Sequence, residues 1–220
     1  MRYPMFRYAY FATVLLVVVA MFSASGCRSL LTTAAYLIHG TDLDAEFEGL
    51  EGKRVVVVCR TTSDLEFRDS VVAEDLAKKA GILLRQNGKK IEVVDQRDVA
   101  AWTDENTWSE YAEIGDALDA DMVLGIDLQS FKLRQGQTLY QGQADVSITV
   151  HDCGETGGIV FERELLRSLY PPNTGIPVSD RRENEFRRQF IEILADQIGR
   201  FFYTHDAYSD YALDAEAFGQ

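Results

Sequence analysis

Cysteine and histidine are scarce in this sequence, which has three of each among its 220 residues. Three cysteines allow at most one intrachain disulfide. The cysteines and histidines also lack the spacing of metal ligands, so the sequence predicts no metal site and no cofactor. The glycines within residues 154–158 lack the strand-to-helix context of a phosphate-binding loop.

Basic residues are few as well, because 22 Lys and Arg stand against 35 Asp and Glu, for a net charge of −13. Loss of a leader that carries Arg2 and Arg7 and no acid would make this −15. Nucleic acid and anionic membrane surfaces would repel such a chain. Attachment to a bilayer must therefore come from lipid or from an apolar segment.

The N-terminus has the pattern of a secretory signal. Arg2 and Arg7 are the only charges before an uncharged, mostly apolar stretch over residues 8–26. Its apolar part is about 15 residues long, which is short of the ~20 residues of a transmembrane helix. The sequence therefore predicts a signal peptide over residues 1–26.

Cys27 follows the small residues Ser25 and Gly26, as in the lipobox of bacterial lipoproteins, although Ala24 stands where leucine is usual. The resemblance implies that Cys27 is lipidated and attaches the chain to the membrane, facing the periplasm. Because Arg28 rather than Asp follows the cysteine, it favours the outer over the inner membrane. The alternatives are a cleaved secretory peptide without lipid and an uncleaved anchor.

If Cys27 carries lipid, Cys59 and Cys153 remain as a candidate disulfide pair in an oxidising compartment. The alternative is that Cys59, at the end of an apolar run, is a buried free thiol.

Three regions follow the leader. The sequence predicts a membrane-proximal helix up to Gly40 and a connector within residues 27–52, a single α/β domain over residues 53–203, and a mobile acidic tail over residues 204–220. In the domain, the run Val55–Val58 predicts a buried strand, and residues 69–87 predict a helix that starts at Asp69 or Ser70. A short strand over residues 91–94 and one broken or two short helices within residues 99–118 complete a βαβα half.

The second half predicts an antiparallel meander. A strand opens at Met122 and shifts its apolar parity near Gln129 and Ser130, which indicates a bulge. Residues 143–151 alternate polar and apolar side chains, and a turn over residues 154–158 leads into a strand over residues 159–169. Asp180 and Glu183 have the spacing of a capping box, and an apolar stripe over residues 186–201 predicts a final helix on the sheet. The fold class is α/β with a mixed sheet in the order βαβαβββα.

This order resembles the small α/β module of the curli-secretion lipoprotein CsgG, of the TolB amino-terminal domain and of lipoprotein activators of penicillin-binding proteins. The likeness covers roughly residues 53–203 and rests on residues 53–58, residues 120–125 and the polar-alternating hairpin. It implies a binding or assembly module of the envelope without enzyme activity, and it transfers no site residues.

The remaining candidates for chemistry are few. His151 and Cys153 lie two residues apart and could form a thiolate pair beside Asp145 or Asp152. The alternative is that these are ordinary polar side chains on the solvent-facing side of a half-exposed strand. Trp102 and Trp108 are the best candidates for a partner contact. We therefore expect a non-catalytic binding or scaffold module of the envelope, with an envelope protein or a second copy as partner. The alternatives are a subunit of an oligomeric secretion or assembly complex and, more distantly, a Cys/His hydrolase.

Overall fold

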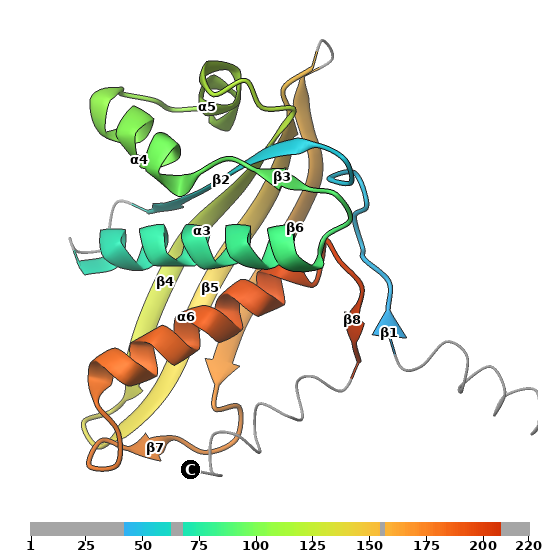
Figure 1. Cartoon of the computed structure of the whole chain (residues 1–220). Helices are drawn as coiled ribbons and strands as arrows, with labels where there is room; N and C mark the ends of the chain where they lie inside the picture. The colour runs from blue at the N-terminus through green and yellow to red at the C-terminus, as the bar shows by residue number, and fades with distance from the viewer. Residues whose placement is uncertain (1–41, 63–67, 155–156, 208–220) are drawn as a thin grey trace, which may run out of the picture. The chain divides into compact units, whose positions relative to one another are not determined.

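The computed structural model describes residues 42–62, 68–154 and 157–207, and the predicted α/β class with a mixed sheet is confirmed (Figure 1). The longer strands are β2 (Arg54–Thr61), β4 (Met122–Gln135), β5 (Leu139–Asp152) and β6 (Gly158–Tyr170). The two-residue strands are β1 (Asp42–Leu43), β3 (Glu92–Val93), β7 (Ile176–Pro177) and β8 (His205–Asp206). The helices are α3 (Arg68–Asn87), α4 (Gln96–Glu105), α5 (Tyr111–Ala117) and α6 (Glu183–Gly199).

The main sheet has the strand order β3-β2-β4-β5-β6, with β7 beside β5, whereas β1 and β8 form a separate two-stranded sheet. Strand β2 is parallel to both β3 and β4, and the later pairs are antiparallel. Because β3 and β4 lie on opposite sides of β2, right-handed crossovers place α3 on one face of the sheet and α4 with α5 on the other.

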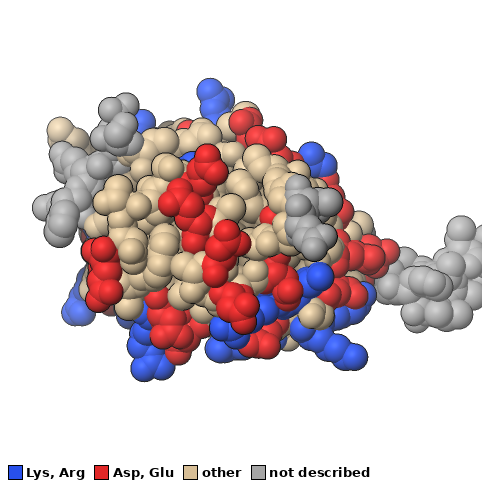
Figure 2. Space-filling model, turned by 90° about the horizontal axis from the view of Figure 1, so that it is seen from above, with Lys and Arg blue, Asp and Glu red and all other residues tan. Residues whose placement is uncertain are grey.

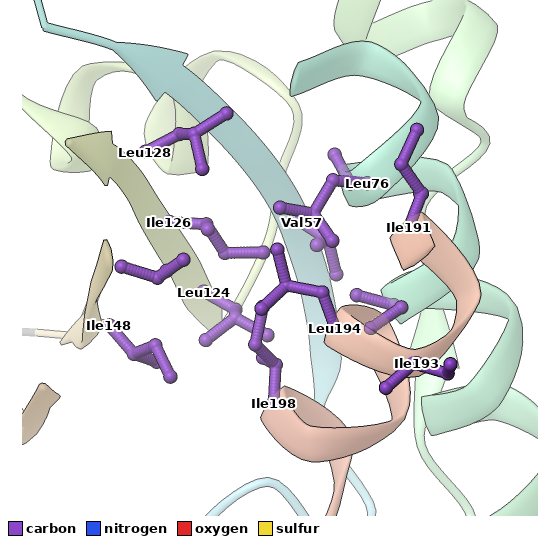
Figure 3. Close-up of a cluster of buried hydrophobic side chains, with 14 of the residues drawn as sticks. Val57, Leu76, Leu124, Ile126, Leu128, Ile148, Ile191, Ile193, Leu194 and Ile198 are labelled. Atoms are coloured by element: carbon purple, nitrogen blue, oxygen red, sulfur yellow. The ribbon is translucent and has the colours of Figure 1, made fainter. Parts of the chain in front are cut away.

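The unbroken valine run of β2 supplies both faces of the sheet. Val55 and Val57 belong to the large core beneath α3 and α6, whereas Val56 and Val58 belong to a smaller core beneath α4 and α5. Side chains from α3, α6 and the sheet meet in the large core (Figure 3). A stretch of central strand that is buried on both faces must be apolar at every position, as Val55–Val58 is.

Helix α6 packs on the sheet beside α3, as its apolar stripe predicts (Figure 1). The stripe residues Phe186, Phe190, Leu194 and Ile198 are fully buried. The expectation that the stripe extends to Phe201 is wrong in one detail, because the helix ends at Gly199 and Phe201 is only partly buried. Beyond the helix, Phe202 and Tyr203 are buried in the large core.

The predicted start signals of two helices are wrong. Helix α6 has Arg182 at its N-cap, and Asp180 lies in the preceding turn, where its backbone N–H donates to the carbonyl of Pro177 at 3.0 Å. Asp180 is therefore two residues too early to cap the helix. Helix α3 already includes Asp69 and Ser70, so neither residue is its N-cap.

The bulge predicted near Gln129 and Ser130 is confirmed in β4. The pairing of β4 with β5 shifts register between Leu128 and Ser130, and again between Lys132 and Arg134. The first shift moves the apolar side chain of Phe131 back onto the core face, where its ring stacks on that of Phe190 with the centroids 5.3 Å apart.

Among the helices that the structure describes, none has the length and apolar character needed to cross a membrane.

Candidate functional site

The N-terminal signal, Cys27 and the predicted membrane-proximal helix lie outside the described residues. The described connector enters the domain through Phe47, which packs on Phe161, and through Leu50, which is buried in the large core.

The candidate disulfide between Cys59 and Cys153 is not formed, and both residues are free thiols. Cys59 packs against the core under α3 and α6, whereas Cys153 packs against the core under α4 and α5. Cys59 also pairs with Ile126, four residues along β4 from the end at which Cys153 lies. At about 3.3 Å per residue along a strand, this separation exceeds the ~7 Å between Cα atoms that a disulfide tolerates.

His151 and Cys153 do not make a catalytic pair. The Nε2 atom of His151 lies 3.1 Å from the hydroxyl oxygen of Thr149, and its ring contacts Tyr111. The thiol of Cys153 packs instead against Gly115 on α5. Burial, followed by nearby carboxylates that include Asp116, raises the pKa of Cys153 to about 11, which keeps the thiol protonated near neutral pH.

The carboxylates considered with this pair do not complete a site either. Asp145 accepts hydrogen bonds from the Ser130 hydroxyl at 2.6 Å and the Arg167 backbone N–H at 2.8 Å, near the register shifts of β4 and β6. Asp152 accepts from the Gly154 backbone N–H at 3.0 Å in the turn after β5. The described ranges hold no group of three or more His, Cys, Asp or Glu that could bind a metal ion. The geometry gives no support to a Cys/His hydrolase.

Trp102 and Trp108 are both half-buried and pack against the smaller core. Trp102 lies on α4, and Trp108 lies in the connection to α5, with its ring 5.6 Å from that of Tyr111. The surrounding stretch is acidic, because residues 98–131 contain nine Asp and Glu and no Lys or Arg. Acidic side chains are spread over the face seen from above (Figure 2). Any partner that uses the two tryptophans would meet a negative surface.

The sequence does not predict the network that holds α5 on the sheet. Arg60 of β2 pairs with Asp127 of β4, and its guanidinium lies 4.6 Å above the ring of Tyr111. The hydroxyl of Tyr111 donates to the same carboxylate at 2.9 Å, and Arg60 also donates to the carbonyl of Ser109 at 3.2 Å. Burial and the charge of Asp127 raise the pKa of Tyr111, which therefore stays a neutral donor. Because these contacts satisfy the polar groups within the domain, the network positions α5 and offers no reactive group.

The network gives a testable pH dependence through His151. Burial, and to a smaller extent Arg60, lowers the pKa of His151, although Asp127 opposes the shift. The unfolded chain therefore binds the proton first, so the stabilising contribution is present above the unfolded pKa of about 6.5 and is lost as the pH falls. We expect the free energy of unfolding to decrease between pH 7 and pH 5, and less steeply in His151→Gln. Urea titrations at pH 7 and pH 5 measure the free energy of unfolding of both proteins. An equal decrease between the two pH values in the wild type and in His151→Gln would contradict the prediction.

The exposed large apolar side chains of the described residues are concentrated on β6. Four of the six exposed large hydrophobic side chains are on this strand, namely Ile159, Val160, Leu166 and Leu169. Leu166 has an exposed fraction of 66%. Leu43 of β1 has an exposed fraction of 51% and lines one groove together with Leu166. Clustering of exposed apolar side chains marks binding surfaces more often than it marks ordinary surface.

A groove of about 540 Å³ opens beside this strand. Its apolar walls are Leu43, Leu165, Leu166 and Phe201, and its polar rim includes Ser168, Gln197 and Arg200. The rim groups already have partners, since the hydroxyl of Ser168 donates to Gln197 and Arg200 pairs with Asp196 at 2.6 Å. The lining also includes the carboxylates of Asp44 and Glu46, of which Glu46 pairs with Arg163, so the groove combines apolar walls with acidic groups.

No protein-family model matches this chain, and no curated protein matches it either. Solved structures with a similar fold include a PelC dodecamer from Paraburkholderia phytofirmans, which is 12% identical at a TM-score of 0.43 and aligns over 74% of this chain and 96% of that one. They also include lipoprotein GNA1162 from Neisseria meningitidis, at 11% identity and a TM-score of 0.40 over 66% and 96% of the two chains. A minor lipoprotein from Acinetobacter baumannii is 16% identical at a TM-score of 0.32, over 69% and 90%. The structural neighbours thus include bacterial lipoproteins, and at these scores they assign no function to this chain.

Proposed function

We propose that this protein is a lipid-anchored bacterial envelope protein whose folded domain is a non-catalytic binding or assembly module. The apolar surface of β6 and its groove is the observation that carries the binding role. Four of the six large apolar side chains that are exposed in the described residues lie on this strand, and clustered exposed apolar side chains mark binding surfaces.

The N-terminal sequence supports the anchoring part of the proposal. Positive charge at Arg2 and Arg7, a short apolar stretch and small residues before Cys27 together form a lipoprotein signal. Several acyl chains on one residue hold a protein on a bilayer, which a single chain does only marginally. Arg28 after the cysteine favours the outer membrane, with the domain facing the periplasm.

The anchoring proposal predicts that Cys27→Ser abolishes incorporation of a palmitate analogue and releases the protein from the membrane fraction. Cys59→Ser is the matched control, because it removes a thiol of the folded domain and should keep both label and membrane attachment. Labelling in bacterial cells followed by fractionation measures both. A Cys27→Ser protein that stays full-length and membrane-bound would show an uncleaved anchor instead.

The partner of the module is either a different envelope protein or another copy of this chain. Light scattering coupled to size exclusion of the detergent-solubilised protein distinguishes them. A single defined oligomer would favour a subunit of an assembly complex, and a monomer would favour a module that binds a different protein.

A further inference from the structure

Strand β6 is the last strand of the main sheet, and within the described residues nothing pairs with its outer edge. The nearby strand β7 pairs with β5 instead. An unpaired edge presents backbone N–H and C=O groups to any chain that can lie alongside it, so proteins usually shorten or protect such edges.

Two bulges limit the usable part of this edge. The pairing of β5 with β6 shifts register between Ala144 and Val146 and between Val150 and His151. The longest uninterrupted run of pairing on β6 is Phe161–Leu165, because beyond the two shifts only Gly158–Ile159 and Ser168–Tyr170 pair with β5. The bulges prevent pairing along the whole strand, while these five residues can still accept a short extended segment.

The two faces of this short edge differ in chemistry. Phe161 and Leu165 pair with core residues of β5 and pack against the large core, and Leu165 also lines the groove. Glu162 and Glu164 point to the opposite face and are exposed. Arg163 forms an ion pair with Glu46, whereas the ion pairs of the described residues include neither Glu162 nor Glu164.

We propose that the edge Phe161–Leu165 takes up an extended segment of a partner protein as an additional strand. The segment carries Lys or Arg on the face of Glu162 and Glu164 and apolar side chains on the alternate face, directed toward the groove. Backbone hydrogen bonds to the edge provide affinity, and the groove and the two carboxylates provide specificity. This inference rests on the proposed binding role and states the chemistry of its partner.

A second copy of β6 does not fit the charged centre of this edge, residues 162–164. Residues that face each other across an antiparallel pair lie on the same face, so a two-fold pair centred within residues 162–164 would place like charges opposite each other. Centring on Glu162 or Glu164 opposes two glutamates, and centring on Arg163 opposes two arginines. The acidic tail of this chain is also unsuitable, because residues 204–220 contain no Lys or Arg.

The test uses the full chain in detergent micelles and two fluorescent seven-residue peptides, one alternating lysine with leucine and one alternating glutamate with leucine. We expect the lysine peptide to bind at least tenfold more tightly than the glutamate peptide, and the double variant Glu162→Lys/Glu164→Lys to reverse this order. Asp104→Lys/Glu105→Lys on α4 is the matched control, because it changes the net charge equally and should preserve the wild-type order. Fluorescence anisotropy gives the affinities.

Hydrogen exchange on the wild-type protein separates strand addition from charge attraction alone. Saturating lysine peptide should slow exchange of backbone amides within residues 161–165, and a lysine peptide with a central proline, which lacks one backbone donor, should bind several-fold more weakly. The proposal fails if residues 161–165 exchange at the same rate with and without peptide. It also fails if the control variant reverses the preference as fully as the β6 variant. Either failure leaves the palmitate result, and hence the anchoring proposal, unaffected.

Discussion

Truncation of Phe190 to alanine should lower the free energy of unfolding of the domain by about 3–5 kcal/mol. Phe190 is fully buried, stacks on Phe131 and lies directly over Gly142 of β5, where a Cβ atom would come within 2.6 Å of its ring. The backbone beneath the ring belongs to a paired strand and cannot move in to fill the space. The loss is therefore expected at the upper part of the range for core truncations.

Thermal unfolding followed by circular dichroism measures this effect. For a domain of this size, a loss of 3–5 kcal/mol corresponds to a decrease in Tm of roughly 6–20 °C. Leu166→Ala is the matched control, because it removes a large apolar side chain that is mostly exposed and should change Tm very little. An unchanged Tm in Phe190→Ala, together with loss of a co-purifying partner, would mean that α6 uses this face as an interface.

Most of the sheet and its helices can be predicted from periodicity in the sequence. The spacing of apolar residues within one segment indicates which of its side chains are buried, because it follows from the local geometry of a strand or helix. This holds for the run Val55–Val58, for the alternation over residues 143–151 and for the stripe on α6. The parity shift near Gln129 reports the bulge in β4 for the same reason. Helix starts are less predictable, because Asp180 has the right spacing from Glu183 but lies in a turn that the preceding strand determines.

The candidate binding surface could not be predicted in the same way. Its groove combines residues from the connector, from β6 and from the end of α6, three segments far apart in the sequence. One local signal was present in the sequence, since the apolar residues Val160 and Leu166 fall out of phase with Phe161 and Leu165, as Phe131 does with the earlier apolar residues of β4. The network of Arg60, Tyr111 and Asp127 left no such signal, because it depends on the parallel register of β2 and β4.

The ring of Tyr111 explains why a glycine, Gly125, stands inside the most buried part of β4. A Cβ atom at this position would lie 2.7 Å from ring carbons of Tyr111, a side chain with only 3% exposure. Arg60 and His151 both contact the ring, so the ring has little freedom to move. The glycine thus lets α5 lie close to the sheet.

Gly125→Ala should therefore destabilise the domain by about 1–3 kcal/mol through overpacking, and by more if Tyr111 loses its hydrogen bond to Asp127. A double-mutant cycle isolates the cause. In a Tyr111→Ala background the clash is gone, and alanine is favoured over glycine within a strand by about 0.5–1 kcal/mol, so Gly125→Ala should become neutral or stabilising there. Urea titrations of the four proteins give the coupling free energy. A similar cost of Gly125→Ala in both backgrounds would show that the tyrosine ring is not what excludes a side chain at residue 125.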